Sequence, residues 1–282
     1  GKNNPQYLRI TSNLVQNYVM LDRYTEAQEL LDQLKEYSES SGKKNEGYAS
    51  FLNTQAVFYQ NKGEYTKAEP LLKEALMITI DIFGNDNRFS LAALNNLASL
   101  YSHLGRYDES EKYYQEAFKL HESNDKQRKY YATVLMNYSE LLISQEKYEE
   151  AMELSIKASE IFKNEFSEDT LTYLTTLYDQ GNIYFREKQY DKALNIYKSI
   201  LDTKEKETYE TKKDYAFHLR NYGIAMLALN DKKDGLKHIL DAGSILKDFY
   251  GNKHKYYVSL QKDMAQAYRL NSIYDKAYEN YT

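Results

Sequence analysis

The sequence contains no cysteine and no tryptophan, and its 282 residues include only two prolines and 11 glycines. Without cysteine, the chain has no disulfide framework, no thiolate metal site and no thiol nucleophile. An all-β sandwich or barrel needs turn residues roughly every 8–12 positions, and so few glycines and prolines do not supply them. The composition therefore predicts a helical protein.

Long apolar runs are absent as well. No stretch approaches the roughly 18 uninterrupted apolar residues of a membrane-spanning helix, and the opening GKNNPQYLRI lacks the apolar core of a signal peptide. The formal net charge of -5 gives no overall attraction to nucleic acid or to an anionic membrane. We therefore expect a cytoplasmic protein that makes no direct contact with nucleic acid and none with a membrane.

Tyrosine is abundant instead, with 30 residues against 10 phenylalanines, and one tyrosine marks an internal repeat. Taking Tyr107 as the marker, the same local pattern returns every 41 or 42 residues, at Tyr24, Tyr65, Tyr148, Tyr190, Lys232 and Tyr274. Three residues after the marker the series is Ala27, Ala68, Ser110, Ala151, Ala193, Gly235 and Ala277. Nine before it the series is Val15, Ala56, Ala98, Ser139, Gly181, Gly223 and Ala265. Six before it stand the large residues Tyr18, Tyr59, Tyr101, Leu142, Tyr184, Met226 and Tyr268.

Each repeat contains two helical patterns. In the third repeat, residues 94–104 carry apolar or small side chains at i, i+3, i+4 and i+7, Gly105 interrupts the pattern, and a second helix begins near Tyr107. So short a connection forces the two helices into an antiparallel hairpin. Because small side chains let helices cross closely, we expect Ala98 and Ser110 to touch, with Tyr101 and Tyr107 packed in the same hairpin.

These residues resemble the tetratricopeptide repeat family, whose small and large positions are matched in order by Leu94, Leu97, Ala98, Tyr101, Gly105, Tyr107, Ser110, Tyr114 and Ala117. The long unit is similar to the kinesin-light-chain type of this repeat. The resemblance implies an all-α fold, a right-handed α-α superhelix of about seven helical hairpins. We expect a single array over residues 1–282, with hairpin units at approximately 6–41, 46–83, 88–123, 127–165, 169–205, 210–250 and 254–282.

Two departures from the family pattern carry further expectations. The sixth unit has Lys232 at the marker position and Gly235 where most units have alanine, so we expect its hairpin to be the loosest. The sequence stops within the second helix of the seventh unit, which suggests a segment of a longer protein.

The resemblance also implies that the first helices of the units line a concave groove that binds extended peptides. Eleven residues before each marker stand Asn13, Thr54, Asn96, Asn137, Asp179, Asn221 and Asp263. An amide side chain both donates to and accepts from a peptide backbone, so this polar column is a candidate ligand surface. Two other interpretations stay open, since a groove open to water is simply polar and asparagines also bridge neighbouring helices.

Positions next to this column add further candidates. In the later repeats they include arginine and lysine, which favour a carboxylate or an acidic side chain as the ligand. The predicted groove residues are Asn13, Asn53, Asn95, Asn96, Asn137, Tyr178, Asp179, Asn182, Arg186, Arg220, Asn221, Lys262, Asp263 and Arg269.

Sequence signatures of catalysis are missing. The five histidines form no i, i+4 ligand pair, and GxSxG, GxGxxG and GxxxxGK[ST] do not occur. Basic clusters such as KQRKYY at 126–131 fall between hairpins, where charged linkers are expected. We therefore expect no enzyme activity, no metal site and no cofactor.

The leading hypothesis is a non-catalytic scaffold for protein–protein interaction, which binds a protein or peptide segment in its concave groove. That segment can belong to another domain of the same protein. The alternative is a regulatory repeat arm of a multidomain enzyme, such as a caspase-like CHAT protease or a bacterial signalling protein, whose catalytic domain lies outside this chain. A structural spacer or a homo-oligomer is the third hypothesis.

Overall fold

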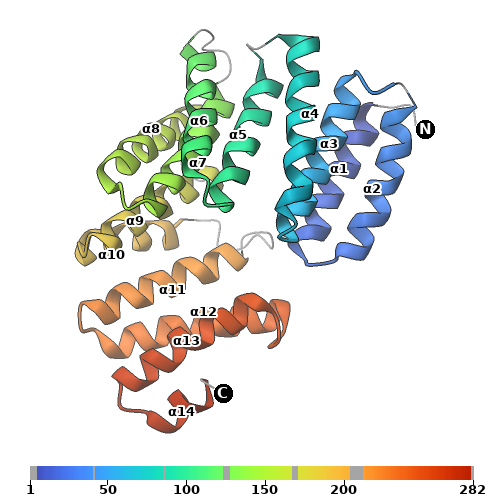
Figure 1. Ribbon diagram of the computed structural model, residues 1–282. Coiled ribbons are helices and arrows are strands. Elements are labelled where there is room, and N and C mark those ends of the chain that lie inside the picture. Colours follow the sequence, from blue (N-terminus) through green and yellow to red (C-terminus); the bar gives the residue numbers. More distant parts are fainter. Residues whose placement is uncertain are drawn as a thin grey trace. The chain divides into compact units, whose positions relative to one another are not determined.

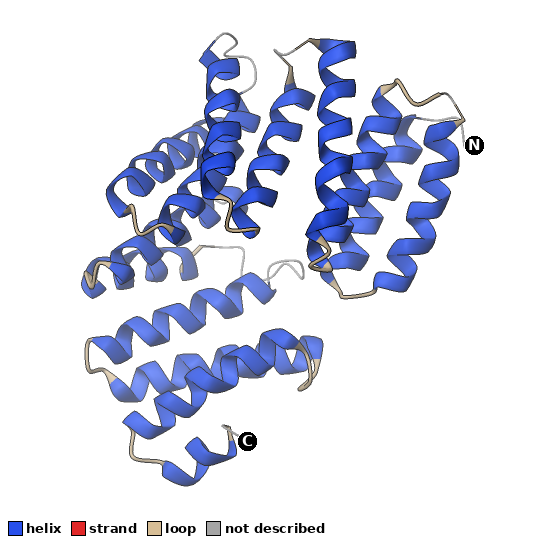
Figure 2. Ribbon diagram, in the orientation of Figure 1, coloured by secondary structure: helices blue, strands red, loops and turns tan. Residues whose placement is uncertain are grey.

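The structure is a computed structural model that describes residues 5–40, 42–84, 87–122, 128–166, 171–203 and 212–280. Within those ranges every regular element is an α-helix, and no strand occurs (Figure 2). The predicted all-α fold class is therefore confirmed. Also within those ranges, no helix combines the length and the apolar character needed to cross a bilayer.

The chain divides into two compact units, Gly1–Leu141 and Leu142–Thr282, and the division falls inside the seventh helix. The first seven helices are α1 (Pro5–Met20), α2 (Tyr24–Glu39), α3 (Glu46–Asn61), α4 (Tyr65–Phe83), α5 (Arg88–His103), α6 (Tyr107–Glu122) and α7 (Arg128–Ser144). The others are α8 (Tyr148–Phe166), α9 (Leu171–Arg186), α10 (Tyr190–Leu201), α11 (Lys212–Ala228), α12 (Lys232–Tyr250), α13 (Lys255–Leu270) and α14 (Tyr274–Glu279). Within the two units, α1 and α2, α3 and α4, α5 and α6, α9 and α10, α11 and α12, and α13 and α14 form antiparallel pairs (Figure 1).

The connections from each odd-numbered helix to the next one have the same backbone conformation. Two residues before each second helix, the chain adopts a left-handed conformation, at Asp22, Gly63, Gly105, Glu146, Lys188, Asn230 and Ser272. The next residue donates its backbone N–H to the carbonyl of the large residue six before the marker, as Arg106 does to Tyr101 over 2.9 Å. This bond closes the C-terminal cap known as the Schellman motif. Glycine, which adopts positive φ without strain, stands at only two of the seven turns, so the cap bond and the packing hold the other five.

The small columns lie where the two helices of a hairpin cross. Ala98 and Ser110 are fully buried, and the Ser110 hydroxyl donates to the Ala98 carbonyl over 2.7 Å. The expected contact between these two residues is therefore confirmed, and Tyr101 is buried as well. The expectation for Tyr107 is wrong, because its side chain is 39% exposed at the start of α6.

The sixth hairpin, α11 with α12, is not loose. A Cβ placed on Gly223 would lie 2.8 Å from the carbonyl oxygen of Gly235, and a Cβ on Gly235 would lie equally close to the carbonyl oxygen of Gly223. Real Cβ atoms do not tolerate that distance. The expectation of loose packing is therefore wrong, since the two facing glycines let the backbones approach more closely than alanines would.

The core of each unit runs from one hairpin into the next. In the first unit, Val15, Leu31, Leu52 and Ala75 belong to one buried cluster, and they come from α1, α2, α3 and α4 in turn. In the second unit, another cluster joins residues of α10 to α14, among them Leu201, Ala216, Ile239, Leu260 and Ala277. Neighbouring hairpins thus bury the apolar faces that a single hairpin would leave exposed.

Candidate functional site

In the first unit, the predicted asparagines join successive odd-numbered helices. The Asn96 amide of α5 donates to Asn53 Oδ1 of α3 over 2.6 Å. The Asn137 amide of α7 donates to Asn95 Oδ1 of α5 over 3.0 Å. In each pair, a residue twelve before its marker meets a residue eleven before the next marker, because stacking successive repeats places these two columns side by side.

The same rule holds in the second unit. The Asn221 amide of α11 donates to the Tyr178 hydroxyl of α9 over 2.8 Å, and Arg220 Nε donates to Asp263 Oδ2 of α13 over 2.7 Å. Bridging of neighbouring helices, one of the interpretations that the sequence leaves open, therefore accounts for at least one hydrogen bond of each of these side chains. An amide can form about four hydrogen bonds, so each asparagine keeps capacity for a ligand, and its contact with a ligand stays a prediction.

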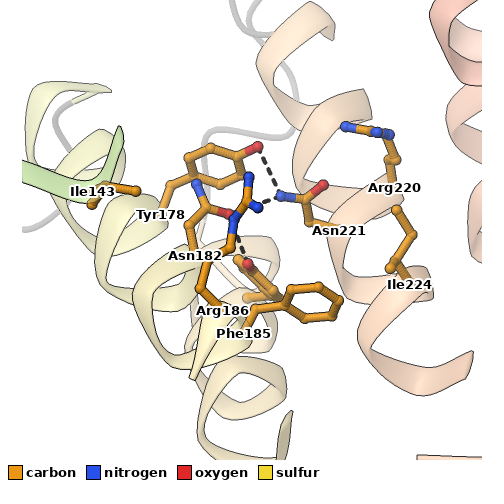
Figure 3. Close-up of a pocket in the computed structure, with 9 residues that line it drawn as sticks. Ile143, Tyr178, Asn182, Phe185, Arg186, Arg220, Asn221 and Ile224 are labelled. Atoms are coloured by element: carbon orange, nitrogen blue, oxygen red, sulfur yellow. Dashed lines mark hydrogen bonds between the residues drawn. The ribbon is translucent and has the colours of Figure 1, made fainter. Parts of the chain in front are cut away.

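A pocket of about 440 Å³ opens beside this bridge in the second unit (Figure 3). It brings together five of the predicted groove residues: Tyr178, Asn182, Arg186, Arg220 and Asn221. Its other lining residues are Ile143, Phe185, Tyr197 and Ile224. α9 and α11 are the first helices of successive repeats, and they contribute opposite walls of the pocket, as Figure 3 shows.

A hydrogen-bonded cluster forms one side of this pocket. Asn182 Oδ1 accepts from the Tyr197 hydroxyl over 2.8 Å and from the Asn221 amide over 3.0 Å, while Asn221 also donates to Tyr178. Burial raises the pKa of both the Tyr178 and the Tyr197 hydroxyls, so the two phenols stay protonated at neutral pH. The cluster therefore holds both amides in fixed orientations.

Tyr197 is a pocket residue that the sequence reasoning missed. It reaches the pocket from α10 because Gly181 of α9 has no side chain, and a Cβ there would lie 2.6 Å from the Tyr197 ring. The sequence contains a signal for this contact, since this repeat has glycine at the position nine before the marker, where most repeats have a larger residue.

The four predicted cations have different surroundings. Arg186, the last residue of α9, is exposed and lines the pocket, whereas the guanidinium of Arg220 is held by Asp263. Lys262 and Arg269 are exposed on α13 and line neither this pocket nor the hollow next to it.

That neighbouring hollow has a volume of about 180 Å³ and is largely apolar. It shares Phe185 and Ile224 with the pocket. Its remaining lining residues are Leu227, Ala228, Asp263, Gln266 and Leu270. The two spaces therefore adjoin along the side chains of Phe185 and Ile224.

His218 lies behind the pocket wall rather than in the pocket. Its ring centroid is 5.0 Å from that of Tyr178, and burial lowers the pKa of the imidazole from 6.5 to about 4. The imidazole is therefore neutral at physiological pH and packs as an aromatic ring.

The other predicted residues are spread over both units. Asn13 and Asn53 line a hollow of about 630 Å³ in the first unit, together with Arg9, Gln16 and Glu46. Asn95 is buried, Asn96 and Asn137 are half-buried, and Asp179 is half-buried on α9.

Over the described ranges of the chain, no three or more His, Cys, Asp or Glu side chains gather in a way that could hold a metal ion.

Solved structures that are similar to this chain include the following three. BtubC (BKLC) from P. vanneervenii is 20% identical, with a TM-score of 0.63 over 86% of this chain and 92% of that one. A putative kinesin light chain from Podosopora anserina, with nearly identical TPR-like repeats, is 14% identical, with a TM-score of 0.57 over 70% of this chain and 94% of that one. NprR in complex with its cognate peptide NprX is 15% identical, with a TM-score of 0.64 over 97% and 76% of the two chains.

A comparison with curated proteins found no match. The sequence pattern of the tetratricopeptide repeat, by contrast, matches residues 47–123 and 130–206, which together make up more than half of the chain. The structural likenesses, at 20% identity or less, agree with the resemblance seen in the marker columns and with the expected similarity to kinesin light chain repeats. The chain belongs to the tetratricopeptide repeat family.

Proposed function

We propose that this chain is a non-catalytic interaction module, which binds an extended peptide segment in the pocket between α9 and α11. The segment belongs to another protein or to another domain of the same protein. The proposal requires no cofactor, no direct contact with nucleic acid and no contact with a membrane, and it places the module in the cytoplasm.

The observation that carries the proposal is the pair of oriented amides in the pocket, Asn182 and Asn221. A peptide main chain presents alternating N–H and C=O groups, and an amide side chain complements both. Because the Tyr178 and Tyr197 hydroxyls already hold these amides, less side-chain freedom is lost when a ligand binds. The volume of about 440 Å³ lies within the range of about 300–1,000 Å³ usual for ligand sites.

The likeness to NprR adds support, since that protein was solved with its cognate peptide and aligns with 97% of this chain. Its identity of only 15% carries the fold and not the ligand. The pocket residues of this chain therefore have to be tested directly.

The test begins with a selection of random 12-residue peptides, displayed on phage, against the full chain. Enriched peptides are synthesised with acetylated and amidated ends and titrated calorimetrically. We expect Asn221→Ala to weaken their binding about tenfold, because one lost hydrogen bond to a ligand contributes roughly 1 kcal/mol and the orientation of Asn182 is lost as well.

Asn195→Ala is the matched control, because Asn195 is exposed on α10 and lines neither the pocket nor the two hollows. It should leave the affinity unchanged. Thermal unfolding of both variants separates a loss of binding from a loss of structure. The proposal is wrong if no peptide is enriched, or if the enriched peptides bind wild type and Asn221→Ala equally well.

A further inference from the structure

Arg186 is a cation that lines the pocket beside Asn182 (Figure 3) and has no partner among the described residues. Within the described part of the chain it makes no ion pair and no hydrogen bond, whereas the other lining cation, Arg220, is neutralised by Asp263. The nine described residues that line the pocket include no aspartate and no glutamate. A negative group that enters the pocket therefore meets one uncompensated positive charge.

The chemistry of arginine narrows the choice of that group. A planar guanidinium with five N–H donors matches a carboxylate in a bidentate pair. The side chains of Asn182 and Asn221 lie beside Arg186 (Figure 3). Their amides can therefore hold the main chain of a peptide while an acidic side chain of the same peptide reaches the guanidinium.

The adjoining apolar hollow supplies a second requirement. Leu227, Ala228 and Leu270 surround a space of about 180 Å³ on the far side of Phe185 and Ile224. A side chain that fills this space removes apolar surface from water, so an apolar residue is favoured there.

We propose that the peptide bound in this pocket carries an acidic side chain that pairs with Arg186 and, a few residues away, an apolar side chain that fills the hollow beside Phe185 and Ile224. The inference rests on the proposed function and adds the ligand class. The positive charge of Arg186 favours the acidic residue of the peptide. The apolar hollow adjoins the pocket, so it favours an apolar residue nearby in the same peptide.

A purely structural role for Arg186 makes a different prediction. As the last residue of α9, its charge also interacts favourably with the helix dipole. In that role, replacement would lower the thermal midpoint and leave peptide selectivity unchanged. The decisive readout is therefore selectivity.

The experiment uses phage display with the random 12-residue peptides fused through their C-termini, so that no free terminal carboxylate is present. We expect the wild-type chain to enrich peptides with Asp or Glu near an apolar residue. In the synthetic amidated peptide, replacing the acidic residue by its amide should weaken binding about tenfold, the upper range for a partly desolvated pair with arginine. Arg186→Gln should weaken the parent peptide equally, and the two losses should not add.

Arg186→Glu provides a stricter test, because it should shift the selection toward peptides that carry Lys or Arg. Arg269→Gln is the control, since Arg269 is an exposed cation of α13 that lines neither space. Ala228→Phe places a ring in the apolar hollow and should abolish the preference for an apolar residue, with the acidic preference retained.

The two proposals fail in different ways. If enriched peptides depend on Asn221 but show no acidic preference, or bind wild type and Arg186→Gln equally, peptide binding stands and the ligand class proposed here is overturned. If Asn221→Ala has no effect, the pocket itself is not the binding site and both proposals fall.

Discussion

Replacement by alanine should affect the stability of the protein differently at the two glycines of α12. Gly235 faces Gly223 at the crossing with α11, and an added Cβ would lie 2.8 Å from a backbone oxygen and 2.9 Å from the side chain of Leu227. Gly243 faces α13, and an added Cβ would lie 3.0 Å from Met264 Sδ. A methionine side chain is flexible and can move aside, whereas a backbone carbonyl in a packed helix cannot.

The expected magnitude follows from two terms. Replacing glycine by alanine within a helix stabilises it by about 1 kcal/mol, and this term is nearly the same at both positions. Overpacking against a fixed neighbour costs roughly 1–3 kcal/mol and applies only to Gly235→Ala. The free energy of unfolding of Gly235→Ala should therefore be about 1–3 kcal/mol lower than that of Gly243→Ala.

Thermal unfolding followed by circular dichroism measures this difference. For a chain of this size, 1 kcal/mol corresponds to a shift of about 2–4 °C in the midpoint. We expect Gly243→Ala to lie at or above the wild-type midpoint and Gly235→Ala to lie below that of Gly243→Ala. Equal shifts in the two variants would refute the close approach of α11 and α12.

Three further predictions concern packing and pH. Ala98→Leu should destabilise the third hairpin by about 1–3 kcal/mol through overpacking, and an unchanged thermal midpoint would contradict the crossing at Ala98. A double-mutant cycle of Asn95→Ala and Asn137→Ala should give a coupling of about 0.5–1.5 kcal/mol for their hydrogen bond, and additive effects would argue against it. Because the folded pKa of His218 is about 4 and its ordinary value is 6.5, the unfolded chain binds the proton first, and stability falls as pH drops from 6.5 toward 4. Between about pH 7.5 and 4.5, urea unfolding should show wild type losing about 2–3 kcal/mol more than His218→Gln, and equal losses would show that His218 does not cause the slope.

The hairpins could be predicted from the sequence because their packing fixes the spacing of side chains. Two helices that cross closely need small residues at fixed positions, so the columns that contain Ala98 and Ser110 reveal both the helix pairs and their contact. The backbone conformation of the turns is harder to predict from the sequence. Lys188 and Ser272 adopt the left-handed conformation that Gly105 adopts, because the cap bond and the packing of the hairpin impose it on any residue at that position.

The candidate site was predictable in part. The columns identified Asn221 and Arg220, and the rule that pairs one column with the next repeat would also have given their partners Tyr178 and Asp263. Arg186 pairs with no other described residue, and whether a cation is paired depends on side-chain contacts that column positions do not fix.

The misjudged sixth hairpin has a similar cause. Within its own column Gly235 is a departure from the pattern, and only the facing column, which contains Gly223, shows that the two glycines form a pair. Two glycines that face each other bring the backbones together, whereas a single glycine opposite a larger residue leaves a gap. Residues that face each other in the two columns therefore have to be considered together.

The most direct test of peptide binding in the second unit is NMR spectroscopy of the side-chain amides. An enriched, end-blocked peptide is titrated into the full chain labelled with ¹⁵N-asparagine, with the resonances assigned through Asn→Gln variants. We predict that the Asn182 and Asn221 amides shift with the same dissociation constant that calorimetry gives, while the exposed Asn195 does not shift. A peptide that binds with that affinity and leaves Asn182 and Asn221 unshifted would contradict the account.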